Sequence, residues 1–189
     1  KAEIAGITAR AMRGDLDFEA ALDERVKLLK GLPLHRIKEV RREQISYAPG
    51  GRALVQTMRA YGAYTALVSG GFTLFADYFA KRIGFDEATA NVLEFENDTL
   101  TGTVARPIVG QDTKLEKLQS LAKAHELDLS QTMAVGDGAN DLKMIKAAGM
   151  GVAIHAKPVV AAEAQYRFNH SDLTGLLFLQ GFAEEDFVR

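Results

Sequence analysis

The stretch TMAVGDGANDL, residues 132–142, runs from a short apolar segment into a glycine-rich bend that carries two carboxylates. We expect residues 132–137 to form a buried strand, because a short apolar run bounded by turn residues is typical of one. A helix is expected from about Asp141 to Ala148. A strand that passes through a polar bend into a helix is typical of folds in which parallel strands alternate with covering helices.

The same alternation extends outward from this stretch in both directions. The apolar run TALVSGG, residues 65–71, lies between a predicted helix over 51–61 and one that starts near Phe72, and two further short strands follow the opening stretch. Residues 92–109 alternate in polarity and turn at Asn97-Asp98, which predicts a β-hairpin. The sequence therefore predicts an α/β fold, a Rossmann-like parallel sheet with helices on both faces, plus a β-hairpin.

The N-terminal part has the residue pattern of helices and no strand pattern. Apolar residues recur at three- and four-residue spacing over 2–30, which predicts helices. The bend at Arg13-Gly14-Asp15 divides this stretch, and Asp17 is placed to cap the second helix. Gly31 and Pro33 end it, and Pro49-Gly50-Gly51 marks a clear break before the core.

Composition limits the classes of protein that fit. The 189 residues are 47% hydrophobic and 25% charged, as in an ordinary globular domain. The formal net charge of −2 argues against a nucleic-acid partner. The absence of cysteine excludes disulfides and thiolate metal sites and fits a cytoplasmic address. No apolar run approaches the roughly 20 residues that cross a bilayer, so no membrane partner is predicted.

Polar clusters follow three of the predicted strands, at 69–71, at 137–141 and at 169–170. In open α/β sheets ligands bind at the carboxyl ends of the strands. Asp137 is placed to bind Mg²⁺, which prefers hard oxygen ligands. Asp141 could bind the metal through water or orient the inner ligands, and Asn140 could donate to a phosphate oxygen. The alternative is structural, with Asn140 or Asp141 capping a helix.

Ser69-Gly70-Gly71 offers a hydroxyl and two unhindered backbone N–H groups, which together would form an anion cradle. An ordinary glycine turn is the alternative. Ser69 is not expected to be a nucleophile of the Gly-x-Ser-x-Gly type, because Leu67 stands where the first glycine would be. Lys114, expected to begin a helix after a polar loop, is the candidate cation for phosphate chemistry, with Lys117 as its rival.

Taken together, SGG after a strand, a helix-initial lysine and GDGAND after another strand resemble three motifs of the haloacid dehalogenase-like hydrolases. ITARAMRGDLDFEAALDERVKLLKGLP, residues 7–33, resembles the helical cap of the phosphoserine phosphatases of that superfamily. This resemblance divides the chain into a small helical cap over 1–46 and a hydrolase core over 47–189.

The resemblance implies Mg²⁺-dependent hydrolysis of O-phospho-L-serine through a phosphoaspartyl intermediate, in L-serine biosynthesis. It assigns Lys114 to catalysis and Asp137 and Asp141 to the metal site. The residues that it implies for phosphate or substrate binding are Ser69, Gly70, Lys114 and Asn140 in the core and Met12, Phe18 and Arg25 in the cap. Met12 and Phe18 would shield the site from water, and Arg25 would bind the substrate carboxylate bidentately.

One motif of the family is missing. No Asp-x-Asp-x-Thr follows an apolar strand; Asp15-Leu16-Asp17-Phe18 lies in the cap instead. We therefore expect the nucleophile strand to precede Lys1, and the chain to be part of a longer enzyme and inactive alone. Two alternatives stay open: the same fold acting on another small phosphate or transferring phosphate to homoserine, and a non-catalytic phosphate-binding module. A homodimer also stays open.

Overall fold

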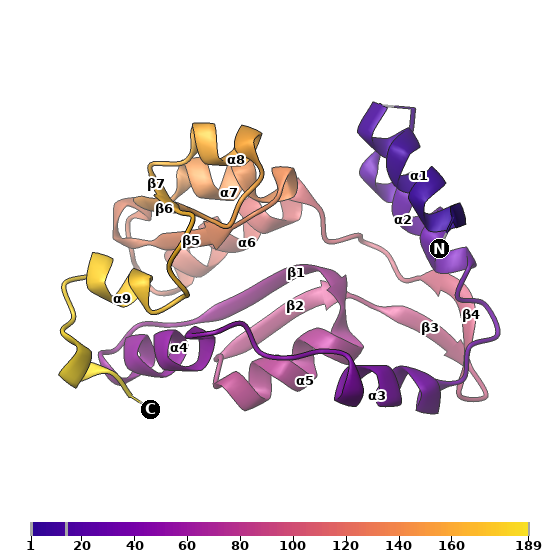
Figure 1. Cartoon of the computed structure of the whole chain (residues 1–189), viewed down its shortest axis with the longest axis horizontal. Helices are drawn as coiled ribbons and strands as arrows, with labels where there is room; N and C mark the ends of the chain where they lie inside the picture. The colour runs from indigo at the N-terminus through magenta and orange to yellow at the C-terminus, as the bar shows by residue number, and fades with distance from the viewer. Residues whose placement is uncertain (1, 14, 189) are drawn as a thin grey trace.

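The computed structural model describes residues 2–13 and 15–188, apart from the side chains of Ala2, Met12 and Arg13. It is a mixed α/β fold in which a β-hairpin (β3 and β4) and the two N-terminal helices, α1 and α2, lie at one end of the molecule (Figure 1). In the described part of the chain, no helix is both long enough and apolar enough to cross a membrane.

Nine α-helices occur in the described residues. They are α1 Ala2–Arg13, α2 Phe18–Lys27, α3 Leu34–Glu43, α4 Gly51–Ala60, α5 Thr73–Ile83, α6 Gln111–Ala124, α7 Leu142–Ala147, α8 Pro158–Glu163 and α9 Gly175–Leu179. The strands are β1 Ala66–Phe72, β2 Glu87–Asn91, β3 Leu93–Glu96, β4 Thr99–Val104, β5 Met133–Gly136, β6 Met150–Ile154 and β7 Tyr166–Phe168. Short 3₁₀ turns, η1 Leu129–Gln131, η2 Ala139–Asp141 and η3 Glu184–Asp186, complete the order.

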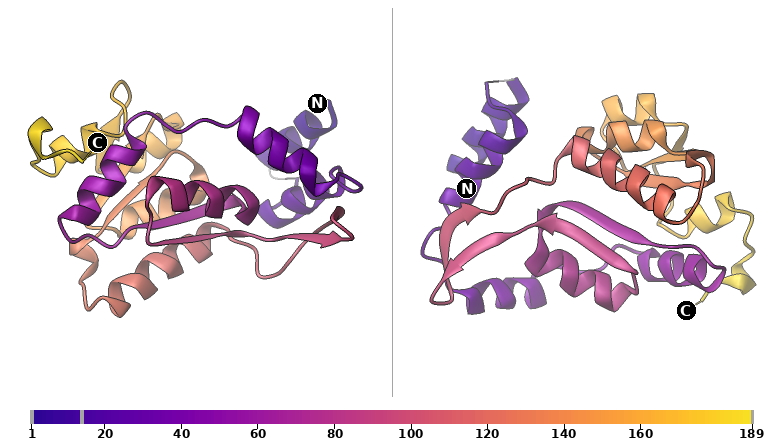
Figure 2. Two further views of the ribbon diagram at one scale, coloured as in Figure 1. Left: turned by 90° about the horizontal axis from the view of Figure 1, so that it is seen from below. Right: turned by 180° about the vertical axis from the view of Figure 1, so that it is seen from behind.

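The parallel strands form two separate ladders. β1 pairs with β2, and β5, β6 and β7 pair in that order. Among the described residues no ladder joins β1 to β5, so each of these two strands has one edge without a partner strand. Figure 1 and both views of Figure 2 show the ladders as two blocks, with α4 and α5 beside the first and α7 and α8 beside the second. An interior strand edge is costly to leave unpaired, because its N–H and C=O groups lose partners.

Local signals account for several element boundaries. Asp17 caps α2 as predicted, since its Oδ1 accepts the N–H of Ala20 at 2.7 Å. The hairpin β3–β4 turns at Asn97 and Asp98, both with positive φ, which are residue types that tolerate this conformation. Gly84, with a φ of 106°, ends α5 in the left-handed conformation that glycine adopts without strain.

Three apolar clusters hold these parts together. The first joins α2 and α3 to the hairpin and contains Leu22, Val26, Ile37, Leu93, Leu100, Val104 and Ile108. The second joins α4, β6 and α9 through Leu54, Val152, Leu176 and Leu177. The third packs α7 and α8 against β6 through Ile145, Ala153, Val160 and Ala164. Because α4 lies just before β1, the second cluster links the two ladders without any strand pairing.

The structure departs from the sequence predictions in two elements that bear on the site. β2 was not predicted, since EATAN is short and its only apolar residues are two alanines, although it does alternate with polar residues. The loop expected over 110–113 is instead the start of α6, which begins at Gln111 with Gly110 as its N-cap. Lys114 is therefore the fourth residue of this helix. Asp112 in the first turn favours the earlier start, because a negative charge there complements the helix dipole.

Candidate phosphate and metal site

A buried ion pair lies between α6 and the acidic bend that follows β5. Lys114 Nζ is 2.6 Å from Asp141 Oδ1, and both side chains are less than one-tenth exposed. The other carboxylate oxygen, Asp141 Oδ2, accepts the backbone N–H groups of Gly138 at 3.0 Å and Asp137 at 3.2 Å. Asp141 thus binds α6 with one oxygen and fixes the bend with the other. Buried charges persist only when they are paired in this way.

Gly136 makes this arrangement sterically feasible. A Cβ at Gly136 would lie 2.5 Å from both Cβ and Cγ of Asp141, which no side chain can tolerate. The carboxylate of Asp141 therefore occupies space that any residue other than glycine would fill. Gly136 is therefore required for the buried position of the Asp141 carboxylate.

Asp137 differs from Asp141 in its surroundings. Its side chain is exposed, and in the described residues it takes part in no hydrogen bond or ion pair. The described part of the chain holds no group of three acidic or imidazole side chains that could by itself bind a metal. A carboxylate on a bend that Asp141 holds by two hydrogen bonds suits Mg²⁺. This ion binds one or two protein carboxylates and takes further ligands from water and phosphate.

Asn140 brings the acidic bend to the glycine-rich end of β1. A Cβ at Gly70 would lie 3.6 Å from Asn140 Nδ2 and 3.4 Å from Phe18 Cζ. Both distances correspond to ordinary van der Waals contact, so Gly70 lies directly between Asn140 and Phe18. Gln111 Nε2 also donates to the carbonyl of Ala139, which holds the start of α6 to the bend. The clusters at 69–71 and 137–141 therefore meet.

Ser69 and the glycines form an irregular end of β1. The β1–β2 register shifts between Val68 and Phe72, which pair with Thr89 and Asn91. Ser69 Oγ accepts the N–H of Gly71 at 3.0 Å, so its own proton stays available to donate. The predicted cradle thus has one of its two glycine N–H groups engaged with the serine itself.

Of the three residues expected in a cap, Met12, Phe18 and Arg25, the two with described side chains differ in their surroundings. Phe18, the first residue of α2, also contacts the Gly110 position, where a Cβ would lie 3.6 Å from Phe18 Cδ1. Arg25 is half-buried, and its Nε donates to the carbonyl of Ala21 in the same helix at 3.0 Å. The side chain of Met12 lies outside the described residues. Phe18 therefore reaches the cradle, and Arg25 lies two helical turns further along α2 with its Nε engaged locally.

A link between α2 and the loop after β4 was not foreseen from the sequence. Arg106, in the loop after β4, contacts Asp23 at 2.6 Å and Glu19 at 3.2 Å on α2. This loop continues through Ile108 and Val109 to Gly110, the N-cap of α6. Asn91, at the end of the unpredicted strand β2, is the other unforeseen residue, and its amide contacts both Gly70 and Val109.

The structure also gives the positions of Lys117 and of the polar cluster at 169–170. Lys117, the rival of Lys114, forms an ion pair at 2.8 Å with Glu87, the first residue of β2, and so lies away from the carboxyl ends of the strands. His155 and Asn169, near the third polar cluster, contact each other through His155 Nδ1 and the Asn169 carbonyl at 3.2 Å. The segment after β6 lies beside the acidic bend, since Ala153 pairs with Gly136 and the N–H of Lys157 donates to the carbonyl of Asp137 at 3.2 Å.

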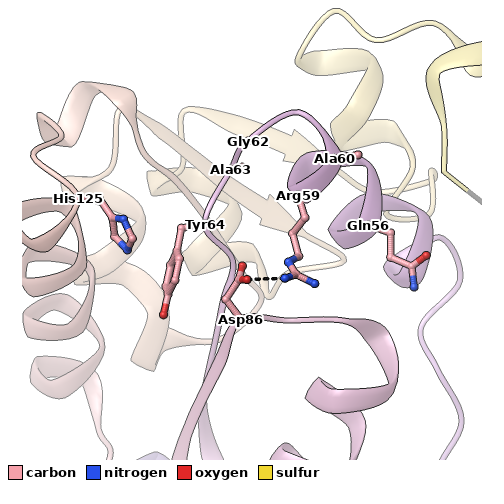
Figure 3. Close-up of a pocket in the computed structure, with 8 residues that line it drawn as sticks. All are labelled: Gln56, Arg59, Ala60, Gly62, Ala63, Tyr64, Asp86 and His125. Atoms are coloured by element: carbon pink, nitrogen blue, oxygen red, sulfur yellow. Dashed lines mark ion pairs between the residues drawn. The ribbon is translucent and has the colours of Figure 1, made fainter.

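A groove of about 470 Å³ lies elsewhere, at the amino ends of β1 and β2. Figure 3 shows Tyr64 and His125 side by side there, next to the ion pair of Arg59 with Asp86. Burial acts to raise the pKa of Asp86, but hydrogen bonds from Thr65 and the contact with Arg59 outweigh it and lower that pKa. Since ligands of parallel α/β sheets bind at the opposite ends of the strands, we do not place the reaction in this groove.

Comparison with known proteins shows which enzymes this chain resembles in sequence and fold. A phosphoserine phosphatase of Streptomyces coelicolor is 45% identical over 97% of this chain and 45% of its own length. The solved structure of a probable phosphoserine phosphatase from Vibrio cholerae superposes with a TM-score of 0.88, at 43% identity, over 95% of this chain and 55% of that one. A phospho-aspartyl intermediate analogue of phosphoserine phosphatase has a TM-score of 0.85 at 36% identity and covers 94% and 84%.

The chain spans about half the length of the first curated relatives that it matches. A family model described as haloacid dehalogenase-like hydrolase matches residues 2–146, which is most of the chain. The match includes α1 to α6, residues 69–71, Lys114 and the acidic bend. The chain therefore belongs to the haloacid dehalogenase-like hydrolases.

Proposed function

We propose that the protein to which this chain belongs is a Mg²⁺-dependent phosphomonoesterase that hydrolyses O-phospho-L-serine to L-serine and phosphate. One observation supports this proposal most strongly. Gly70, Asn140 and Phe18 lie together, and the buried ion pair of Lys114 and Asp141 is next to them. Support for the substrate comes from the relatives, which are named phosphoserine phosphatases. Support for a phosphoaspartyl intermediate comes from the structural neighbour that contains an analogue of it.

The polar groups of the site would divide into phosphate donors, a balancing cation and a supporting carboxylate. Ser69 Oγ–H and the N–H of Gly70 donate to phosphate oxygens, and Asn140 donates from the facing bend. Lys114 balances the negative charge of the nucleophile and of its phosphorylated form, a role that a buried ammonium fills well because little water screens it. Asp141 holds Lys114 and the bend in place.

Mg²⁺ would be held by the free carboxylate of Asp137. Asp141 would support the metal site through the hydrogen bonds that its Oδ2 accepts from the backbone of Asp137 and Gly138. When bound, the ion would neutralise phosphate oxygens and so favour attack on phosphorus. Residues 1–46 would act as a cap, in which Met12 and Phe18 keep water from the phosphate and Arg25 binds the substrate carboxylate. Phe18 already lies against Gly70, which supports this arrangement.

The nucleophilic aspartate would come from a segment upstream of Lys1. The free edges of β1 and β5 support this proposal, because a strand between them would join the two ladders into one parallel sheet. Such a strand would end beside the cradle and the acidic bend, since parallel strands place their carboxyl ends at one edge.

The test uses the full-length protein and the variant Asp137→Asn. We expect phosphoserine turnover to fall by roughly 10²–10³-fold, as for the loss of one charged group that stabilises a transition state. The melting temperature should stay unchanged, because the Asp137 side chain is exposed and unbonded in the described structure. Asp77→Asn is the matched control, because Asp77 on α5 is also exposed and its side chain takes part in no hydrogen bond or ion pair with the described residues.

Retention of wild-type turnover by Asp137→Asn would contradict the proposed metal site. Calorimetry with Mg²⁺ and phosphate separates the enzyme from a binding module. Binding without turnover in the full-length protein would favour the module and refute the proposed activity.

A further inference from the structure

Asn91 is a buried amide whose two polar atoms are both engaged. It ends β2, is 1% exposed, and donates from Nδ2 to the carbonyl of Gly70 at 3.0 Å. Its Oδ1 accepts the backbone N–H of Val109 at 2.7 Å. The amide orientation follows from the partners: a carbonyl only accepts and an N–H only donates, so a flipped amide would oppose like groups.

The two partners of Asn91 belong to the two segments that build the phosphate site. Gly70 lies in the part of β1 where the ladder with β2 is interrupted, with two extra residues on β1 between Val68 and Phe72. Asn91 therefore supplies a side-chain hydrogen bond where the regular main-chain pairing is broken. Val109 directly precedes Gly110, the N-cap of α6, and α6 carries Lys114.

We propose that Asn91 is a positioning residue for phosphoryl transfer: its amide fixes the distance between the Gly70 peptide of the cradle and the segment that leads to Lys114. Asn91 touches neither substrate nor metal and acts through these two backbone groups. The proposal rests on the proposed function, because it assigns a task within that same site. Its importance follows from geometry, since a misplacement of about 1 Å can cost on the order of 100-fold in rate.

An apolar residue could fill the same space but would leave the buried N–H of Val109 and the partly buried carbonyl of Gly70 without their partner. That penalty alone would give Asn91 a structural role, because an unsatisfied buried group lowers stability. The experiment must therefore separate a loss of position from a loss of stability. Asn91→Asp does so, since its protonated form has the same shape and the same donor and acceptor as the amide, whereas its ionised form has no donor for Gly70.

Turnover of the full-length Asn91→Asp variant is measured against wild type from pH 5 to pH 9, with phosphoserine and with p-nitrophenyl phosphate. We expect the ratio of variant to wild-type kcat/KM to fall as pH rises, by up to about tenfold per pH unit once the new carboxyl ionises. Both substrates should be affected equally, because the cradle holds the phosphate that they share. Asn97→Asp, in the exposed hairpin turn, is the matched control and should give a flat ratio.

A second variant and a second measurement make the result independent of turnover. Asn91→Leu should lose roughly 10–100-fold in kcat/KM at every pH, and the amide proton of Val109 should exchange with solvent faster than in wild type. Because protonated Asn91→Asp is isosteric with wild type, it gives an answer at low pH even if Asn91→Leu does not fold. A flat pH ratio for Asn91→Asp, with only its melting temperature changed, would overturn the positioning role. Wild-type protein without phosphoserine turnover would instead refute the proposed function, and the exchange of Val109 would still report on the contact.

Discussion

Removal of Lys114 should expose how strongly the buried ion pair stabilises the core. In Lys114→Met the carboxylate of Asp141 stays buried, with its Oδ2 bonded to Gly138 and Asp137 but its Oδ1 without a partner. Loss of one partner from a buried pair costs about 3–5 kcal/mol. For a domain of this size that corresponds to a fall in melting temperature of roughly 6–20 °C. Thermal and urea unfolding of the full-length protein, followed by circular dichroism, measure it.

The matched control is Lys143→Met, because Lys143 pairs with Asp112 on the surface with both side chains about half exposed or more. Exposed pairs contribute about 0–1 kcal/mol. The double variant Lys114→Met/Asp141→Asn should recover much of the lost stability, since no charge then remains buried and the amide oxygen can still accept an N–H. Equal losses for Lys114→Met and Lys143→Met would refute the view that the site contains a strongly coupled buried pair.

Gly136→Ala should displace the Asp141 carboxylate, lower the free energy of unfolding by about 1–3 kcal/mol and reduce turnover. Gly6→Ala is the control, because open space surrounds Gly6, and it should lower neither quantity. Thermal melts and phosphate-release assays measure the two effects. Arg25→Ala should raise KM for phosphoserine at least tenfold and leave that for p-nitrophenyl phosphate nearly unchanged, because only phosphoserine carries a carboxylate for the guanidinium; equal effects in steady-state assays would refute this role. The lowered pKa of Asp86 means that its ionised form stabilises the fold above about pH 4 and that this contribution is lost as pH falls further. The difference in urea stability between Asp86→Asn and wild type should therefore shrink on acidification, and a growing difference would contradict it.

Local sequence signals were sufficient for most of the elements around the site. The apolar runs before Ser69 and Asp137 form β1 and β5, Asp17 caps α2, and Asn97-Asp98 turns the hairpin. Each of these depends on interactions within a few residues, which composition and spacing encode directly. The family resemblance likewise rested on short contiguous motifs and is confirmed by the family match over residues 2–146.

The rest depends on residues far apart in the chain. β2 is a strand because β1 pairs with it, since the alternation in EATAN rests on two alanines and is a weak signal by itself. The pair of Lys114 and Asp141 spans 27 positions, and the amide of Asn91 joins segments that lie 21 residues before it and 18 residues after it. The sequence by itself determined which chemical groups this protein has and which local elements carry them. Only the tertiary structure decided which carboxylate is buried with the lysine and which is free, because burial and long-range pairing exist only once the chain is packed.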